Sequence, residues 1–371
     1  MIANHLMKKN ICVPPREDHI KETKYEGAYV KEPKVGQHKW VVSFDINSLY
    51  PHIIIQYNIS PEKILGVKSS GVSVNKMLTQ STPLTHLKTE GACLTPNGAM
   101  FKNDGQGFLP EMMETMYNER VIYKKRMLKA KQEYEKTKDP KLIREISRCH
   151  NIQWARKIAL NSAYGAVGNQ YFRYYDVRQA SAITTAGQFI IRFIEQKVNE
   201  YLNNILKTHD KLDYIVASDT DSIYVTLDKL VAKTCEGKDN EQICNFLDRV
   251  VDSRLEPFLE KCFAELADYT NAFKNCMVMK REVVANKGIW VAKKRYMLNV
   301  LDEEGVRLSE PKLKIMGIEA VKSSTPQVCR GKIKEAIKII MGKEQSDLHK
   351  FIADFKKEFF TMTAEQISFP R

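Results

Sequence analysis

The residues best suited to chemistry lie in the run 214–225, where Asp219 and Asp221 stand at the tip of a strand–turn–strand pattern. Apolar and β-branched residues flank the polar tip, which predicts a hairpin. On extended backbone, a spacing of i and i+2 would point both carboxylates to one side. Two such carboxylates repel each other unless a cation lies between them, so the tip is a candidate metal site. Taken alone, it also fits an ordinary acidic surface turn.

A second aspartate follows another apolar strand. Trp40–Phe44 leads into Asp45, and the step Ser48-Leu49-Tyr50-Pro51 follows at once. Mg²⁺ takes oxygen ligands from one or two carboxylates and completes its shell with water and substrate phosphates. Two strands that each deliver a carboxylate therefore predict a two-metal site for phosphoryl transfer.

Basic residues with helical spacing are candidates for binding a triphosphate. Arg120 and Lys124 are four residues apart, and Lys157, Asn161 and Tyr164 are spaced i, i+4 and i+7, so each set shares one helix face. Two antiparallel helices, at about 109–137 and 141–169 with a break at Asp139-Pro140, would set three cations opposite the aspartates. A solvated basic face is the simpler alternative.

Three motifs resemble those of the family B DNA polymerases, in the order in which that family carries them. They are Asp45-x-x-Ser48-Leu49-Tyr50-Pro51, Lys157-x-x-x-Asn161-Ser-x-Tyr164-Gly165 and Asp219-Thr-Asp221-Ser222. The runs Asn58-Ile-Ser-Pro-Glu62 and Lys293-Lys294-Arg295-Tyr296 are similar to those of the replicative polymerases of T-even-type bacteriophages. The resemblance extends from about Tyr25 to about Pro326.

The resemblance implies a role for each motif residue. Asp45 and Asp221 would be the catalytic acids with Asp219 as an auxiliary, and Asp45, Ile46 and Asp221 would hold two Mg²⁺ ions, for which Mn²⁺ can substitute. Tyr50 would lie under the sugar of the incoming nucleotide and act as a steric gate against ribonucleotides. The other residues assigned to the nucleotide are Ser48, Leu49, Arg120, Lys124, Lys157, Asn161 and Tyr164.

The resemblance also implies primer–template DNA and dNTPs as partners. The residues assigned to DNA are Tyr25, Gly27, Gly165, Lys293, Lys294, Arg295 and Tyr296. The composition agrees, because 58 Lys and Arg against 45 Asp and Glu give a net charge of +13, which suits a polyanionic partner. Simple solubility would explain the same charge.

Three positions depart from the family's usual residues. Asn47 stands where a small polar residue such as Thr is frequent, and His52 stands where Ser is usual. Ser218 replaces a Gly, which would put a side chain near the seat of the primer terminus. The backbone N–H groups of Asn47, Ser48 and Leu49, at a strand-to-helix turn, are expected to face triphosphate oxygens.

The expected fold class is α+β: a palm with an antiparallel sheet flanked by helices, an antiparallel two-helix fingers domain, and the start of a thumb. Residues 66–107, rich in Gly, Ser, Thr and Asn, are expected to be an irregular insertion, and further helices are expected at 175–207 and 239–275. The implied domains are 1–24 (N-terminal segment), 25–107 (first part of the palm), 108–169 (fingers), 170–317 (second part of the palm) and 318–371 (partial thumb).

Cysteine usage and hydropathy indicate where in the cell the protein is expected. Eight scattered cysteines indicate reduced thiols, and no apolar run suits a membrane span or a signal peptide. The expected location is the cytoplasm, of an infected bacterial host if the chain is viral. Only 44 residues precede Asp45, which leaves no room for the family's exonuclease domain.

Two alternatives remain open. The first is another palm-type polymerase, either a reverse transcriptase or an RNA-dependent enzyme, because two aspartates alone do not exclude it. The second is a non-catalytic DNA-binding piece or one subunit of a split polymerase, which would need a separate chain carrying exonuclease and thumb segments.

Overall fold

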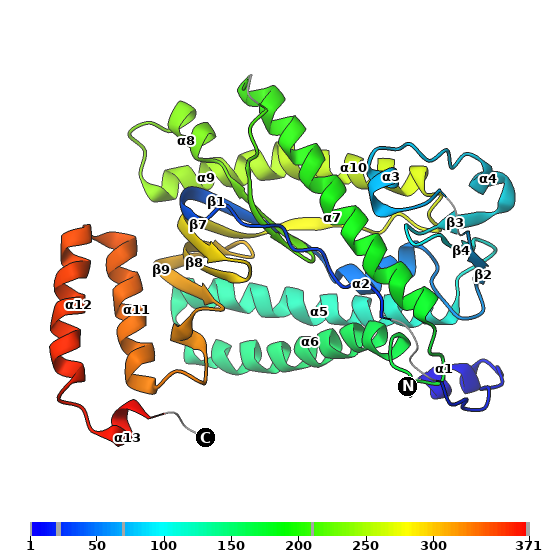
Figure 1. Ribbon diagram of the computed structural model, residues 1–371, viewed down its shortest axis with the longest axis horizontal. Coiled ribbons are helices and arrows are strands. Elements are labelled where there is room, and N and C mark those ends of the chain that lie inside the picture. The colour runs from blue at the N-terminus through cyan, green and yellow to red at the C-terminus, as the bar shows by residue number, and fades with distance from the viewer. Residues whose placement is uncertain (1, 20–23, 69–70, 209–210, 369–371) are drawn as a thin grey trace.

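The computed structural model describes residues 2–19, 24–68, 71–208 and 211–368. Antiparallel sheets and long helices make up this part of the chain, which confirms the α+β class (Figure 1). The first helix, α1 (Ile2–Lys8), lies at one end of the molecule in that view, and the last helices lie at the other end.

A six-stranded antiparallel sheet with the order β5-β6-β1-β7-β8-β9 forms the centre. Side chains alternate along β1, so Val42 and Phe44 enter the main core while Asp45 lies on the opposite face. The strands are β1 (Gly36–Ile46), β5 (Ile215–Asp219), β6 (Ser222–Thr226), β7 (Met279–Ala292), β8 (Arg295–Glu303) and β9 (Val306–Met316).

Helices cover the core face of this sheet. The longest of them, α7 (Val177–Leu206), confirms the helix expected at 175–207, and its Phe189 and Ile190 are fully buried. The helical pattern at 239–275 is also confirmed, as far as Tyr269. The other helices on this face are α2 (Leu49–Gln56), α8 (Asp228–Thr234), α9 (Asn240–Val250) and α10 (Glu256–Tyr269), with a π-helical turn at Val251–Leu255 between the last two.

Two long helices, α5 (Phe108–Thr137) and α6 (Pro140–Val167), form the predicted antiparallel hairpin. The break has a clear cause. Lys138 adopts a left-handed φ of 54°, the Asp139 side chain accepts a hydrogen bond from the Lys141 N–H, and Pro140 fits the first helical turn. In Figure 1 the two helices lie side by side along the sheet.

Residues 66–107 are not irregular, contrary to the expectation. They belong to a small three-stranded sheet, in the order β2-β4-β3, with two short helices. Leu94 and Phe101 are fully buried against the main core, so a few apolar residues suffice to order the segment. The elements are β2 (Ile64–Val67), α3 (Val74–Leu78), α4 (His86–Glu90), β3 (Ala92–Leu94) and β4 (Ala99–Lys102).

Residues Asn58–Glu62 connect the start of α5 to this small sheet through hydrogen bonds. The buried Asn58 amide donates to the carbonyls of Lys102 (2.7 Å) and Gly105 (2.8 Å), and its oxygen accepts from the Gly107 N–H (2.8 Å). The Glu62 carboxylate accepts from the Phe108 N–H at 2.8 Å. An acidic side chain at this end favours the helix dipole.

We expect Asn58→Gly to lower the free energy of unfolding by roughly 2–4 kcal/mol, because three backbone groups lose the partner that the buried Asn58 amide provides. Glycine accepts the left-handed φ of 51° at this position, so backbone strain does not enter. Urea denaturation measures the change. Asn10→Gly is the control, since Asn10 has a similar φ of 56° but is exposed, and its stability should change little.

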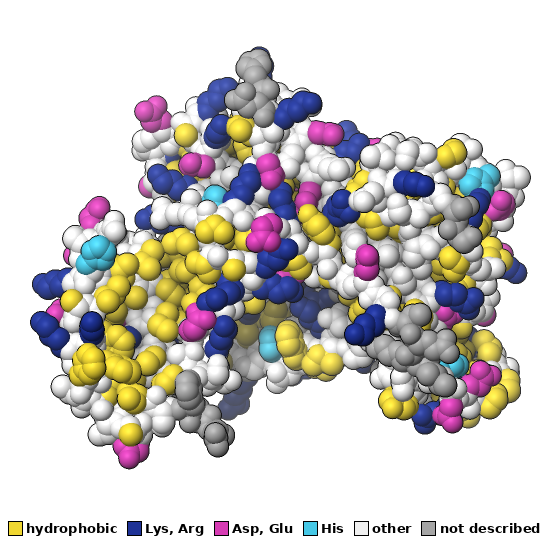
Figure 2. Space-filling view, viewed as in Figure 1, with side chains coloured by type: hydrophobic (Ala, Val, Ile, Leu, Met, Phe, Trp, Pro, Cys, Tyr) yellow, Lys and Arg dark blue, Asp and Glu magenta, His cyan; other side chains and the backbone are white. Residues whose placement is uncertain are grey.

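The C-terminal helices pack lightly on the sheet. Ile337 and Met341 of α11 (Gln327–Gly342) bury against Met297, whereas α12 (Gln345–Phe359) has no buried residue. Figure 2 shows hydrophobic side chains gathered over this end of the molecule. A 3₁₀ turn at Glu319–Val321 precedes these helices, and α13 (Ala364–Ile367) follows them. None of the helices described is both long and apolar enough to cross a membrane.

Candidate nucleotide and metal site

A pocket of about 680 Å³ lies between the main sheet and the α5–α6 hairpin. Asp45 of β1 and Asp221 of the β5–β6 turn line one side of it, and cations of α5 and α6 line the other. Figure 2 shows Lys and Arg side chains gathered in a recess at the centre of the molecule. Every residue assigned to the nucleotide from the sequence lines this pocket: Ser48, Leu49, Tyr50, Arg120, Lys124, Lys157, Asn161 and Tyr164.

The predicted β5–β6 hairpin is present. The prediction that extended backbone points Asp219 and Asp221 to the same side is wrong. Thr220 lies between them with a left-handed φ of 61°, so the alternation of an extended strand does not apply. Asp219 forms an ion pair with Lys294 at 3.1 Å, whereas Asp221 lines the pocket.

Asp45 and Asp221 form a pair of crowded carboxylates. Burial, then the charges of Asp221 and Glu282, raise the pKa of Asp45 to about 8, against the opposing effect of Lys157. Burial also raises the pKa of Asp221, to about 6, and Asp219 and Glu282 add to the effect. Neither carboxylate has an ion-pair partner among the residues described, so both are costly to ionise in this state.

Glu282 is a site residue that the sequence did not reveal. In the pairing of β1 with β7, Ser43 lies opposite Val283 and Phe44 lies opposite Arg281, so Glu282 is the extra residue of a β-bulge. Its carboxylate lies 3.4 Å from the Ser43 hydroxyl, and it lines the pocket beside the aspartates. Bulges redirect side chains near active sites, and no sequence pattern marks this one.

The donor set fits a hard divalent cation. Two unpaired carboxylates offer the oxygen ligands that Mg²⁺ prefers, and a cation would offset the repulsion that raises their pKa values. Across the described part of the chain, no group of three or more His, Cys, Asp or Glu residues is placed to hold a metal. The remaining ligands would therefore be backbone, water or phosphate oxygens, as is usual for Mg²⁺.

The three predicted cations meet at the pocket in different ways. Arg120 is buried and donates to the Ser48 hydroxyl at 2.6 Å. Lys124 pairs with Glu304, in the turn between β8 and β9, at 2.6 Å. The Lys157 ammonium lies 5.5 Å from the centre of the Trp154 ring.

The strand-to-helix turn corrects one expectation. The Asn47 N–H donates to the Val278 carbonyl at 3.0 Å, so it is not available to a phosphate. Ser48 adopts a left-handed φ of 50° and lines the pocket with Leu49. His52 is buried one turn further on, where its ring meets that of Tyr117 edge-on at 4.3 Å.

Tyrosine rings are among the side chains that line the pocket. The rings of Tyr50 and Tyr164 lie 4.6 Å apart. Gly187 of α7 makes room for Tyr50, because a Cβ there would come within 3.2 Å of its ring. The Tyr25 hydroxyl lies against Gly168, where a Cβ would come within 2.2 Å of it. Asn161 is exposed at the pocket's edge.

The residues assigned to DNA lie apart from one another. Tyr25 and Gly165 lie near the end of α6, and the Gly27 carbonyl accepts from Gln188 of α7 at 2.7 Å. Lys293 pairs with Glu32 (3.0 Å) and Arg295 pairs with Glu319 (2.6 Å), in the turn where β7 meets β8.

Tyr296, which the sequence also assigned to DNA, packs in the core beside the sheet. It is buried, its ring stacks on Trp290 with centres 5.4 Å apart, and its hydroxyl lies 2.7 Å from that of Tyr224. Ser218 is also buried, with its hydroxyl facing the protein interior near Glu195 of α7. The Ser218 side chain therefore does not project into the solvent-exposed region where the primer terminus was expected.

A segment before β1 supports the hairpin from outside. The N–H groups of Lys31 and Lys34 donate to Ser218 (3.1 Å) and Val216 (2.8 Å), and the Thr220 N–H donates to Tyr29 (3.0 Å). Residues 29–34 therefore cover the free edge of β5 up to the turn that carries Asp221.

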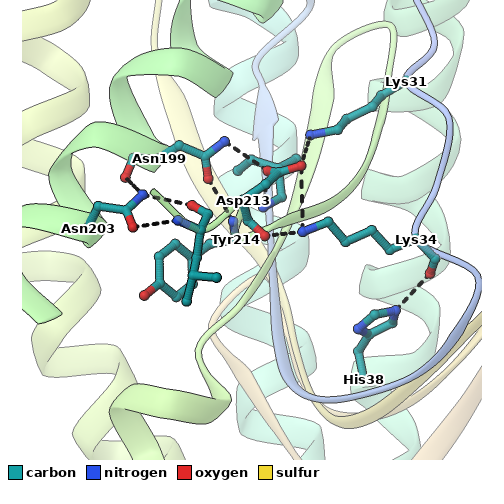
Figure 3. A network of polar contacts seen from close by, with 9 residues as sticks. Lys31, Lys34, His38, Asn199, Asn203, Asp213 and Tyr214 are labelled. Atoms are coloured by element: carbon teal, nitrogen blue, oxygen red, sulfur yellow. Dashed lines mark hydrogen bonds and ion pairs between the residues drawn. The ribbon is translucent and has the colours of Figure 1, made fainter. Parts of the chain in front are cut away.

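Asp213 ties this segment to the sheet and to α7 (Figure 3). Its carboxylate accepts from Lys31 (2.8 Å) and Asn199 (2.8 Å), and it pairs with Lys34 at 3.5 Å. Burial opposes ionisation, but these hydrogen bonds and charges outweigh it and hold the pKa of Asp213 below its ordinary value. The network fixes the position of the hairpin.

We expect Lys31→Met to accelerate hydrogen exchange at the Thr220 amide roughly tenfold, because the edge segment loses its charged anchor. Hydrogen-exchange mass spectrometry over residues 215–226 measures this. Lys197→Met is the matched control, since it removes a lysine from the Lys197–Glu265 ion pair (2.9 Å), which involves no residue of the hairpin. Equal acceleration in both variants would mean that the Lys31 anchor is not specific.

Comparison with known proteins identifies the family. The family model for DNA polymerase family B matches residues 1–369. The DNA-directed DNA polymerase of Escherichia phage RB69 is 38% identical over 91% of this chain, and that of Enterobacteria phage T4 is 34% identical over 97%. A DNA polymerase of Pyrococcus abyssi is 28% identical over 87% of the chain.

The chain spans less than half the length of these relatives: 42% of the RB69 protein, 45% of the T4 protein and 34% of the Pyrococcus protein. The family match nevertheless covers almost all of the chain, and it favours family B over the families of reverse transcriptases and RNA-dependent polymerases. Residues from each of the three motifs line the pocket. The chain belongs to family B of the DNA polymerases.

Proposed function

We propose that this chain carries out template-directed DNA synthesis in phage replication, adding deoxynucleotides from dNTPs to a primer 3′-hydroxyl. The observation that supports it most is the pocket itself. Two carboxylates without ion-pair partners in the described chain, Asp45 and Asp221, face Arg120, Lys124 and Lys157 across one cavity. This is the charge arrangement that phosphoryl transfer from a triphosphate requires.

Asp45 and Asp221, with the backbone carbonyl of Ile46, would hold two Mg²⁺ ions, for which Mn²⁺ can substitute. When bound, the ions lower the pKa of the primer hydroxyl and neutralise charge on the triphosphate. The primer oxygen forms a bond to the α-phosphorus, and the bond to the pyrophosphate oxygen breaks. Asp219, paired with Lys294, would be an auxiliary acid that adds negative charge near the two metal ligands.

Three basic side chains stabilise the negative charge that develops on the leaving pyrophosphate. Arg120, Lys124 and Lys157 bind the β- and γ-phosphates, and Lys124 exchanges Glu304 for phosphate as the nucleotide arrives. Ser48 and Leu49 offer backbone N–H groups to the triphosphate. Tyr50 gates the sugar, while Asn161 and Tyr164 contact the nucleotide, and Tyr164 checks the new base pair.

The fold divides by the same scheme. We assign residues 25–107 and 170–317 to the palm, 108–169 to the fingers and 318–371 to the beginning of a thumb, after an N-terminal segment 1–24. Primer–template DNA would pass Tyr25, Gly27, Gly165 and the lysines and arginine of the β7–β8 turn, Lys293, Lys294 and Arg295. The setting is the cytoplasm of an infected bacterial cell, as the phage relatives suggest.

The alternative of a non-catalytic DNA-binding piece is less well supported, because all the motif residues assigned to the nucleotide line one pocket. That alternative would need a separate chain carrying exonuclease and thumb segments.

Extension of a labelled primer–template with Mg²⁺ and dNTPs tests the proposal. Extension by this chain, stopping at the expected base when one dNTP is withheld, would support it. A folded chain that binds primer–template but never extends it would overturn it in favour of the non-catalytic alternative. A ribonucleotide reaction in parallel should give little product if Tyr50 is the gate.

A further inference from the structure

A second cavity, of about 720 Å³, adjoins the nucleotide pocket and is not needed by the mechanism above. It lies between the α5–α6 hairpin and the strands β8 and β9. Arg120, Lys124 and Lys157 line both cavities, so the two cavities share a wall.

An aromatic platform lines this second cavity. Trp154 of α6 is 48% exposed, which is unusual for so large a ring. His150, one turn earlier on the helix, stacks nearly parallel to it, with ring centres 5.9 Å apart and an angle of 13°. Exposed aromatic faces of this kind are what nucleobases stack on.

The charges around the platform suit an anionic ligand. The four acidic residues that line the cavity each have a lysine partner: Glu135 with Lys138, Glu282 with Lys314, Glu303 with Lys312, and Glu304 with Lys124. Lys131 and Lys157 also line it, and neither has a carboxylate within 4.0 Å in the described chain.

We propose that the cavity is a holding site for a nucleoside triphosphate, with the base on the Trp154–His150 platform and the phosphates at Lys131 and Lys157. The Lys157 ammonium now covers the Trp154 ring at 5.5 Å. A triphosphate draws that ammonium away from the ring, and the base takes its place. The nucleotide then moves toward Asp45 and Asp221 along the shared wall. This inference rests on the proposed function, because it supplies the substrate of that reaction.

Binding without DNA and without metal tests the site separately from synthesis. In EDTA and with no primer–template, dATP should quench tryptophan fluorescence in a saturable way, and the quenching should be lost in Trp154→Ala, in which Trp40 and Trp290 remain. By calorimetry, Trp154→Ala should weaken dATP binding about tenfold, in the range of one base stack. Trp154→Phe keeps a ring and should stay within about threefold of the wild type.

Tripolyphosphate, a ligand without a base, distinguishes the contribution of the phosphates to binding from that of the base. Its affinity should not fall in Trp154→Ala, because it has no base to stack. Ile158→Ala is the control, since Ile158 is exposed on the same helix but does not line the cavity. Unchanged dATP binding in Trp154→Ala, or an equal loss of tripolyphosphate, would overturn the site. A chain that binds dATP in this way but never extends a primer would contradict only the proposed function.

Discussion

Replacing Asp221 with Ala should reduce primer extension by on the order of 10³-fold or more, because the site loses one of its two unpaired carboxylates. Asp221 lies in the turn between β5 and β6, and its side chain takes part in no ion pair in the described chain, so the fold should survive the change. Single-turnover extension of a labelled primer measures the rate, and fluorescence anisotropy measures the affinity for primer–template.

Asp219→Ala is the matched comparison, two residues away in the same turn. Asp219 is paired with Lys294 and does not line the pocket, so we expect a smaller loss, roughly tenfold. Primer–template affinity should change little in either variant. A rate loss in Asp221→Ala that merely followed a loss of DNA binding would count against its role as a metal ligand.

Replacing Asp45 with Asn should stabilise the metal-free protein at alkaline pH. The folded chain holds a proton on Asp45 up to a pKa of about 8, whereas the unfolded chain releases it near the ordinary 3.8. The folded state binds more protons between these values, so stability falls as pH rises through them. At pH 9 we expect the variant to be more stable by on the order of 2–4 kcal/mol, an advantage that shrinks as the pH falls towards 4.

Urea denaturation at several pH values, with and without Mg²⁺, measures this effect. Mg²⁺ should raise the stability of the wild type and leave the variant almost unchanged, because the ion offsets the same repulsion. Asp213→Asn is the control of opposite sign: its pKa is lowered in the fold, so losing its charge should destabilise the protein at neutral pH. A wild type whose stability did not fall between pH 5 and 9 would refute the crowding of Asp45.

The sequence by itself determined a large part of this protein. Strand alternation around Asp45, the turn residues of 214–225 and the helical spacing of Arg120, Lys124 and Lys157 are local signals, because each depends on neighbours a few residues away. They predicted β1, the β5–β6 hairpin and the α5–α6 pair, and with them Asp45, Asp221 and the three cations that share one pocket. The family followed from the order of the motifs.

Only the tertiary structure decided the features that depend on contacts between distant segments. The bulge that turns Glu282 toward Asp45 exists only because β7 pairs with β1, far away in the chain. The burial of Tyr296 and the hydrogen bond from the Asn47 N–H to the Val278 carbonyl likewise depend on segments that come together only in the fold. The raised pKa of Asp45 has the same origin, since burial and charge from remote strands set it, and no local pattern records either.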